Sequence, residues 1–171
     1  LIGIGRTGRV EFDVKVSGVA CHGADAFLSS TMVNAVHESA KLQSTLIENF
    51  KQVFRQFSQN GAECVNSAYI SYQSGGEPTL SVPDSASFVI DRTLLPDESP
   101  DDELVRLGDF VDQQKREGGI DSRSQVSISL RPRPTPPCKP YITSLDTPEI
   151  QSMLNVIKKL TPSHSYYIGR S

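Results

Sequence analysis

Apolar residues occupy every second position near the start of the chain, at Val10, Phe12, Val14 and Val16. This period of two is typical of a β-strand that buries one of its faces. Three further segments have strand-like patterns, at residues 68–73, 81–94 and 126–130. The turn-forming residues 74–78 separate the second strand from the third. We therefore expect four strands.

Two other segments repeat apolar residues at spacings of three and four, as amphipathic helices do. The first repeat consists of Leu42, Leu46, Phe50, Val53 and Phe57. We expect this helix to begin after Ser29-Ser30-Thr31, which offer N-caps, and to end at Asn60-Gly61. The second helix is expected to begin at Ser99-Pro100 and to end at Gly118-Gly119.

The predicted order is strand, helix, strand, strand, helix, strand, which is the split βαβ arrangement. It predicts an α+β, ferredoxin-like βαββαβ domain over residues 9–131, with a four-stranded antiparallel sheet and both helices on one face. Five prolines between residues 131 and 140 predict a stiff linker without regular structure, which we place at 132–146.

Residues 147–171 begin with a helix start at Thr147-Pro148 and reach a strand start near Tyr166. We interpret this segment and residues 1–8 as the two severed ends of a larger domain. The βαββαβ unit would then be an insertion in that domain, and the chain an excised fragment.

Charge and composition exclude several function classes. The 171 residues carry a formal net charge of -3, and the basic residues are scattered. Neither a nucleic-acid-binding stripe nor a basic membrane patch is present. No apolar run approaches the roughly 20 residues that span a bilayer. The cysteines Cys21, Cys64 and Cys138 are widely spaced, which favours neither disulfides nor a thiolate zinc site and indicates a reducing, cytoplasmic location.

His22 is the first candidate for chemistry, because it lies on a loop that follows the first strand. A neutral imidazole there can donate an N–H to a developing oxyanion; the alternative is a loop histidine without a role. A Cys21-His22 nucleophile pair is disfavoured, since adjacent residues on an extended segment project to opposite sides. His37 and His164 look ordinary. No common metal, nucleophile or nucleotide motif is present.

Arg92, at the end of the third strand, is the second candidate. Its guanidinium could bind a substrate carboxylate through two parallel hydrogen bonds. Equally, it could pair with Asp91 or Glu98 as a strand-end arginine. Asn34 is expected to cap the long helix or brace the His22 loop, and a direct contact with substrate is the weaker alternative.

Together these residues resemble the inserted lid, or dimerisation, domain of the di-zinc aminoacylase and carboxypeptidase family, which includes acetylornithine deacetylases, succinyl-diaminopimelate desuccinylases and tripeptidases. The motifs that carry the resemblance are Gly8 through Gly18 leading to Ala20-Cys21-His22-Gly23, Val33-Asn34-Ala35-Val36, Gly75-Gly76 before Val82-Pro83-Asp84, and Asp91-Arg92 with Leu95-Pro96. Leu80 departs from the pattern, because many relatives have Asn there.

The resemblance implies a homodimer formed through the lid, in which His22 reaches the partner's active site and helps polarise the scissile carbonyl. It also implies that Arg92 binds a substrate carboxylate, and that the substrate is an N-acyl amino acid or a peptide. Two zinc ions would be held by a catalytic domain, with no metal ligands and no cofactor in this chain.

Two other functions remain open. The ferredoxin-like fold also serves stand-alone regulatory or small-molecule-binding modules. A single-stranded RNA-binding module has a similar topology, but the acidic net charge and the lack of interleaved basic and aromatic residues disfavour it.

Overall fold

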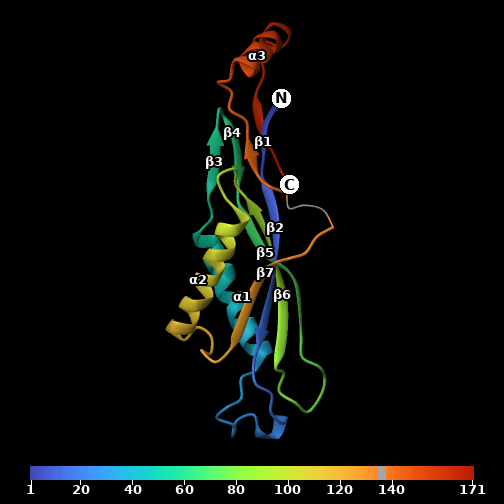
Figure 1. The fold of residues 1–171 in the computed structure, drawn as a ribbon, viewed down its shortest axis with the longest axis vertical. Helices are drawn as coiled ribbons and strands as arrows, with labels where there is room; N and C mark the ends of the chain where they lie inside the picture. Colours follow the sequence, from blue (N-terminus) through green and yellow to red (C-terminus); the bar gives the residue numbers. More distant parts are fainter. Residues whose placement is uncertain (135–137) are drawn as a thin grey trace.

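The computed structural model describes residues 1–134 and 138–171, which form an elongated molecule (Figure 1). Its main part is a four-stranded antiparallel sheet in the order β5-β6-β2-β7. The strands are β2 (Gly8–Ser17), β5 (Ser67–Gly75), β6 (Ser85–Leu94) and β7 (Gln125–Leu130). Helices α1 (Ala35–Gln52) and α2 (Pro100–Glu117) cover one face of this sheet. The predicted ferredoxin-like fold is confirmed.

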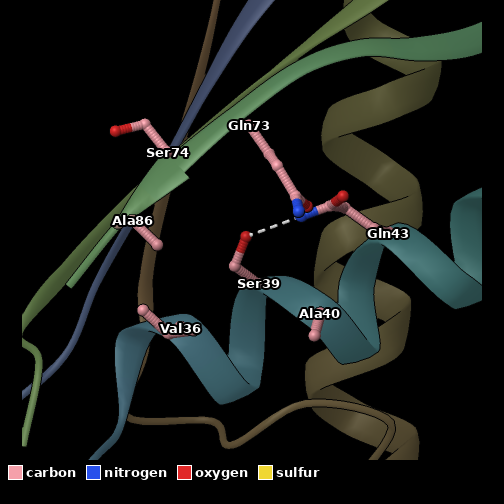
Figure 2. Close-up of a pocket in the computed structure, with 8 residues that line it drawn as sticks. Val36, Ser39, Ala40, Gln43, Gln73, Ser74 and Ala86 are labelled. Atoms are coloured by element: carbon pink, nitrogen blue, oxygen red, sulfur yellow. Dashed lines mark hydrogen bonds between the residues drawn. The ribbon is translucent and has the colours of Figure 1, made fainter.

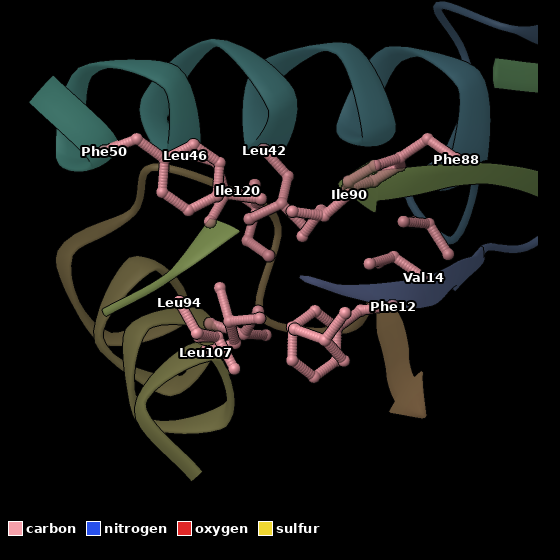
Figure 3. Packing of buried hydrophobic residues seen from close by; sticks show 13 residues of the cluster. Phe12, Val14, Leu42, Leu46, Phe50, Phe88, Ile90, Leu94, Leu107 and Ile120 are labelled. Atoms are coloured by element: carbon pink, nitrogen blue, oxygen red, sulfur yellow. The ribbon is translucent and has the colours of Figure 1, made fainter. Parts of the chain in front are cut away.

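The alternating pattern of β2 divides the two faces of the sheet. Its even-numbered residues from Val10 to Val16 are buried, whereas Arg9, Glu11, Asp13 and Lys15 lie on the open face. The buried side chains meet those of β6 and both helices in one core (Figure 3). Its largest members are Phe12, Phe50, Phe88, Leu42, Leu46, Ile90, Leu94, Leu107 and Ile120. This continuous core fixes both helices on the same face.

Helix α1 is shorter than the sequence predicts. It begins at Ala35, with Asn34 as N-cap, rather than after Ser29-Ser30-Thr31, and it ends at Gln52. Asn60-Gly61 does not end the helix. It forms the turn of a hairpin between β3 (Gln56–Gln59) and β4 (Ala62–Val65). Both turn residues have positive φ, 52° and 77°, which the right-handed twist of a tight hairpin favours.

Helix α2 begins and ends where its sequence signals predict. The side chain of Ser99 accepts a hydrogen bond from the amide of Asp101, and Pro100 occupies the first turn. At the other end Gly118 adopts the left-handed conformation with φ of 77°. These features satisfy backbone groups that a helix end leaves without partners.

The two ends of the chain come together in a second sheet, in the order β8-β1-β9. Its strands are β1 (Ile2–Arg6), β8 (Tyr141–Ile142) and β9 (Tyr166–Gly169), with α3 (Pro148–Leu160) between the last two. The β3–β4 hairpin packs against this sheet in a second core, formed by Ile4, Ala62, Cys64, Leu95 and Ile168.

The proline-rich segment contains more regular structure than predicted. Cys138 forms a bridge with Arg9, and β8 pairs with β1, because the ends of this segment lie beside the second sheet. Residues 135–137 of the predicted linker lie outside the described residues. The boundaries of the proposed domains stay a prediction.

Candidate functional site

His22 lies on the loop between β2 and α1. This loop is at the end of the molecule farthest from the second sheet (Figure 1, lower end). The loop contains one short 3-10 helix, η1 (Gly23–Asp25). A second loop, residues 76–84 between β5 and β6, is bound to it by backbone hydrogen bonds. The amide of Gly23 donates to Leu80 at 2.5 Å and that of Val82 to Cys21 at 2.9 Å. His22 therefore lies on a platform of two loops.

The conformation around His22 leaves one ring nitrogen available as a donor. Its Nδ1 accepts a hydrogen bond from the Ala24 amide at 3.2 Å, and the side chain is exposed. An accepting Nδ1 cannot carry the proton of the neutral ring, so that proton is on Nε2. In the described part of the chain Nε2 has no hydrogen-bond partner. His22 thus presents an N–H to whatever lies beyond this loop.

The base of the His22 loop is closed by a backbone pair. Val19 and Val33 donate to each other's carbonyl oxygens at 2.9 and 3.1 Å. A Cβ atom at Gly18 would lie 2.1 Å from the Val33 carbonyl oxygen, so that this close approach requires a glycine. The sequence signal of a glycine at the end of the strand therefore has a specific structural reason.

Exposed apolar side chains lie on the same two loops as His22. Phe27 is fully exposed, and Leu28 and Leu80 are 83% and 78% exposed. Large apolar side chains gathered at one end of a molecule are typical of a surface that contacts another chain or domain.

Asn34 caps α1, which is one of the two roles predicted for it. Its Oδ1 accepts a hydrogen bond from the amide of His37 at 3.1 Å. The amide oxygen is therefore already engaged. A contact between Asn34 and substrate stays a prediction.

Arg92 is buried, with a side chain that is 4% exposed. Its Nε donates to Glu103 at 3.1 Å, Nη2 donates to Glu98 at 3.4 Å, and Nη1 donates to the Ser67 carbonyl oxygen at 3.3 Å. The alternative of a salt bridge to Glu98 is thus observed. Asp91 instead binds Arg9 on the open face of the sheet.

His22 and Arg92 are not brought together within this chain. Arg92 pairs with Val10 near the start of β2, whereas His22 follows the end of that strand, where Ser17 pairs with Ser85. Seven residues of strand separate the two pairs, which is about 23 Å. A single substrate that touches both side chains would have to extend along the sheet or involve a second copy of the chain. The role of Arg92 in binding a carboxylate stays a prediction.

Glu98 is one of the partners that the sequence predicts for Arg92, but Glu103 is not. Glu103 lies in the first turn of α2, where the helix dipole alone is enough to explain an acidic residue. In the structure Glu103 is buried and also accepts two hydrogen bonds from Arg106, at 2.8 and 2.7 Å. The spacing of residues along α2 could have revealed that Glu103 is buried. Residues 103, 107 and 111 are four positions apart and share one side of the helix, and Leu107 and Val111 are core residues.

The open face of the sheet carries an ionic cluster around Asp91, which is 3% exposed. Arg9 binds both of its oxygens, and the Tyr69 hydroxyl donates to Oδ2 at 3.0 Å. The hydrogen bond to this carboxylate raises the pKa of Tyr69. Asp91 is therefore satisfied by its neighbours.

A groove runs between α1 and the edge strand β5 (Figure 2). Within it the Gln43 side chain donates to Ser39 at 3.1 Å. Its lining residues are Val36, Ser39, Ala40, Gln43, Gln73, Ser74, Gly75 and Ala86. Near the C-terminal end of α1 the surface becomes apolar, because Ile47 of α1, Phe54 after the helix and Val65 at the end of β4 are exposed. This surface combines unpaired strand backbone with apolar side chains, as association surfaces do.

A metal site is not formed by residues 1–134 and 138–171. No group of three or more His, Cys, Asp or Glu side chains in these ranges is arranged to hold an ion. These residues therefore offer no site for a zinc ion, and the resemblance assigns the two zinc ions to a catalytic domain instead. Among the same residues, no helix has the length and apolar character needed to cross a membrane.

Comparison with known proteins gives a family match. The model of a family described as the peptidase dimerisation domain matches residues 4–119. A search of curated proteins found no match.

Solved structures with a similar fold are parts of longer hydrolases. A hydantoinase/carbamoylase family amidase from Burkholderia ambifaria matches with a TM-score of 0.63 at 15% identity, over 98% of this chain and 37% of that one. A tripeptidase from Staphylococcus aureus gives 0.60 at 16% identity, over 98% and 39%. The aminopeptidase PepT from Bacillus cereus gives 0.60 at 13%, over 99% and 40%. At these identities the likeness shows the fold alone, and the chain spans about two fifths of those proteins.

Proposed function

The chain belongs to the peptidase dimerisation domain family, and from this premise we propose that it is the lid and dimerisation domain of a metal-dependent hydrolase. The substrates we propose are N-acyl amino acids or peptides, whose amide bonds the hydrolase cleaves. The family match over residues 4–119 carries this proposal. The structural neighbours described as amidases and peptidases support it.

His22 is the residue of this chain that takes part in the proposed reaction. Its Nε2–H donates to the carbonyl oxygen of the scissile amide, where negative charge develops in the transition state. The Ala24 amide holds the tautomer that this role needs. Because His22 lies on an exposed loop with apolar neighbours, we propose that it enters the active site of the partner subunit.

The two zinc ions belong, in this proposal, to a catalytic domain outside the described residues. Such ions activate water for attack on an amide carbonyl. The role proposed for His22 does not depend on where these zinc ions lie. A cytoplasmic location rests on the three cysteines, all of which are free thiols.

Self-association is proposed to occur through β5 and α1. Antiparallel pairing of β5 with its own copy around a two-fold axis would join two four-stranded sheets into one and pair the two α1 helices beside it. Such pairing would satisfy the open edge and cover Ile47, Phe54 and Val65. The His22 loop lies beyond this surface, and so it stays free to reach the partner.

The experiment that tests the role of His22 uses the full-length hydrolase. His22→Ala is expected to lower kcat about 10²- to 10³-fold, as the loss of one oxyanion donor does. His164→Ala, at a partly exposed histidine far along the chain, is the matched control and should leave kcat unchanged. An unchanged kcat in His22→Ala would contradict the proposal.

Hybrid dimers test whether His22 acts across the interface. His22→Ala subunits are mixed with subunits that lack a metal ligand, each inactive alone. If His22 serves the partner, each hybrid has one complete site, and random pairing restores about a quarter of the wild-type activity. If His22 serves its own subunit, the hybrids stay inactive.

A further inference from the structure

The turn between α2 and β7, residues 118–124, touches the His22 loop at a site that the proposed function does not use. Arg123 donates from Nη1 to the carbonyl oxygen of Ser30 at 2.7 Å and from Nη2 to that of Met32 at 3.5 Å. Both carbonyl groups lie on the limb of the loop that returns from His22 to α1. One guanidinium therefore spans two residues of this limb.

Within the described chain, these two hydrogen bonds connect the returning limb, residues 24–32, to the rest of the molecule. The other hydrogen bonds of residues 24–32 in that part of the chain stay within residues 22–31. The next external ties are those of Gly23 to Leu80 at one end and of Val33 to Val19 at the other. Without Arg123, the segment between these two points would be held only by its own turns.

Arg123 is itself held in place by an adjacent carboxylate. Asp121 accepts from Nε at 3.0 Å, from Nη2 at 2.6 Å and from the backbone amide of Arg123 at 2.9 Å. The amide of Asp121 donates to the carboxylate of Glu38 at 2.6 Å. Glu38 is buried on α1. A continuous series of hydrogen bonds thus leads from the core helix to the His22 loop.

The carboxylate of Asp121 keeps its charge at neutral pH. The hydrogen bond from the Arg123 side chain is the main cause that lowers the pKa of Asp121 to about 2, and the Arg123 amide and the charge of Lys41 act in the same direction. Lys41 also pairs with Glu38 at 2.9 Å. The guanidinium therefore keeps its carboxylate partner under physiological conditions.

We propose that Arg123 is a positioning residue, which holds the returning limb of the loop so that His22 keeps one orientation. This inference rests on the proposed function, because only there does the orientation of His22 matter. A donor that stabilises a transition state must be placed within a fraction of an ångström, and a small displacement is costly in rate. The contribution of Arg123 is thus transmitted through the loop backbone.

The test compares Arg123→Ala, Arg123→Lys and the control Arg116→Ala in the full-length, metal-loaded dimer. Arg116 is an exposed arginine at the end of α2 and touches neither loop. Two readouts are needed, namely hydrogen exchange of the amides of residues 23–32 and the separate values of kcat and KM with an amide substrate.

In Arg123→Ala we expect hydrogen exchange of these amides to become about 10-fold faster, because the loop can then open locally without first breaking the hydrogen bonds to Arg123. We expect kcat to fall about 10- to 100-fold with little change in KM, because the lost interaction belongs to the transition state. Arg123→Lys keeps the positive charge and N–H donors on a single nitrogen but loses the planar fork, and its values should lie between those of Arg123→Ala and wild type. Arg116→Ala should behave like wild type.

Unchanged exchange in Arg123→Ala would overturn the proposal, and so would faster exchange with unchanged kcat. His22→Ala, measured beside these variants, separates this failure from failure of the proposed function. If His22→Ala lowers kcat and Arg123→Ala does not, only the positioning role is wrong. If His22→Ala leaves kcat unchanged, the proposed function fails and the positioning role fails with it.

Discussion

Replacement of Arg92 by methionine tests whether this residue stabilises the fold or binds a substrate. Methionine keeps much of the volume but removes the charge and the donors. Glu103 and Glu98 then lose a partner inside the protein, where the side chain of Glu103 is 7% exposed and that of Glu98 is 17% exposed. We expect a large loss of stability in the absence of any substrate.

The size of this loss follows from the partners that remain. Removal of one member of a buried ion pair commonly costs about 3 to 5 kcal/mol. Here Arg106 still donates two hydrogen bonds to Glu103, and Arg55 still donates to Glu98 at 3.2 Å. We therefore expect a value at the lower end, with the free energy of unfolding reduced by about 3 kcal/mol.

Urea unfolding followed by circular dichroism measures this difference, with Arg116→Met as the control at an exposed position. The double variant Arg92→Met/Glu103→Gln removes both charges and should recover about 1 kcal/mol or more of the loss, because the uncompensated carboxylate is gone. If Arg92→Met unfolds at the wild-type urea concentration while KM for a carboxylate-bearing substrate rises, the structural reasoning is refuted and the role as a ligand is favoured.

Two further predictions concern association and acid stability. Ile47→Asp will shift the dimer toward monomer in sedimentation experiments, because it places a charge on the apolar surface of α1, whereas Val105→Asp on the exposed side of α2 will not; equal shifts would exclude this surface. Asp121 contributes stability that is complete above its unfolded pKa of 3.8 and is lost as the pH falls toward the folded value of about 2, so wild type should lose about 1 kcal/mol across this range. Asp121→Asn should lack that loss in acid unfolding, and an identical pH dependence would contradict the assignment.

The strands of the main sheet could be predicted because each signal is local. The alternation at Val10 to Val16 reports one buried face, and the same parity correctly places the side chain of Arg92 on the core side of β6. The Ser99 cap and Gly118 likewise act on backbone groups within one turn. Local patterns of this kind do not depend on the rest of the molecule.

The end of α1 could not be predicted in the same way. Val53 and Phe57 continue the helical spacing, but Phe57 packs with the second core as part of β3. Asn-Gly is a stop signal for a helix and a turn signal for a hairpin. Contacts with Ile4 and Ile168, far away in the sequence, belong to the core that the hairpin joins. The periodicity alone carries no information about those contacts.

The same distinction applies to the candidate site. The sequence places His22 on a loop, but the tautomer depends on the Ala24 amide, and the orientation of the loop depends on Leu80 and Arg123. Arg123 lies 101 positions after His22 and shares no motif with it. A loop that projects beyond the sheet cannot be held by a core of its own, and it therefore needs hydrogen bonds from neighbouring segments. Local sequence patterns do not reveal such long-range hydrogen bonds. Substitutions at the distant positions that form them can test their contribution to the site.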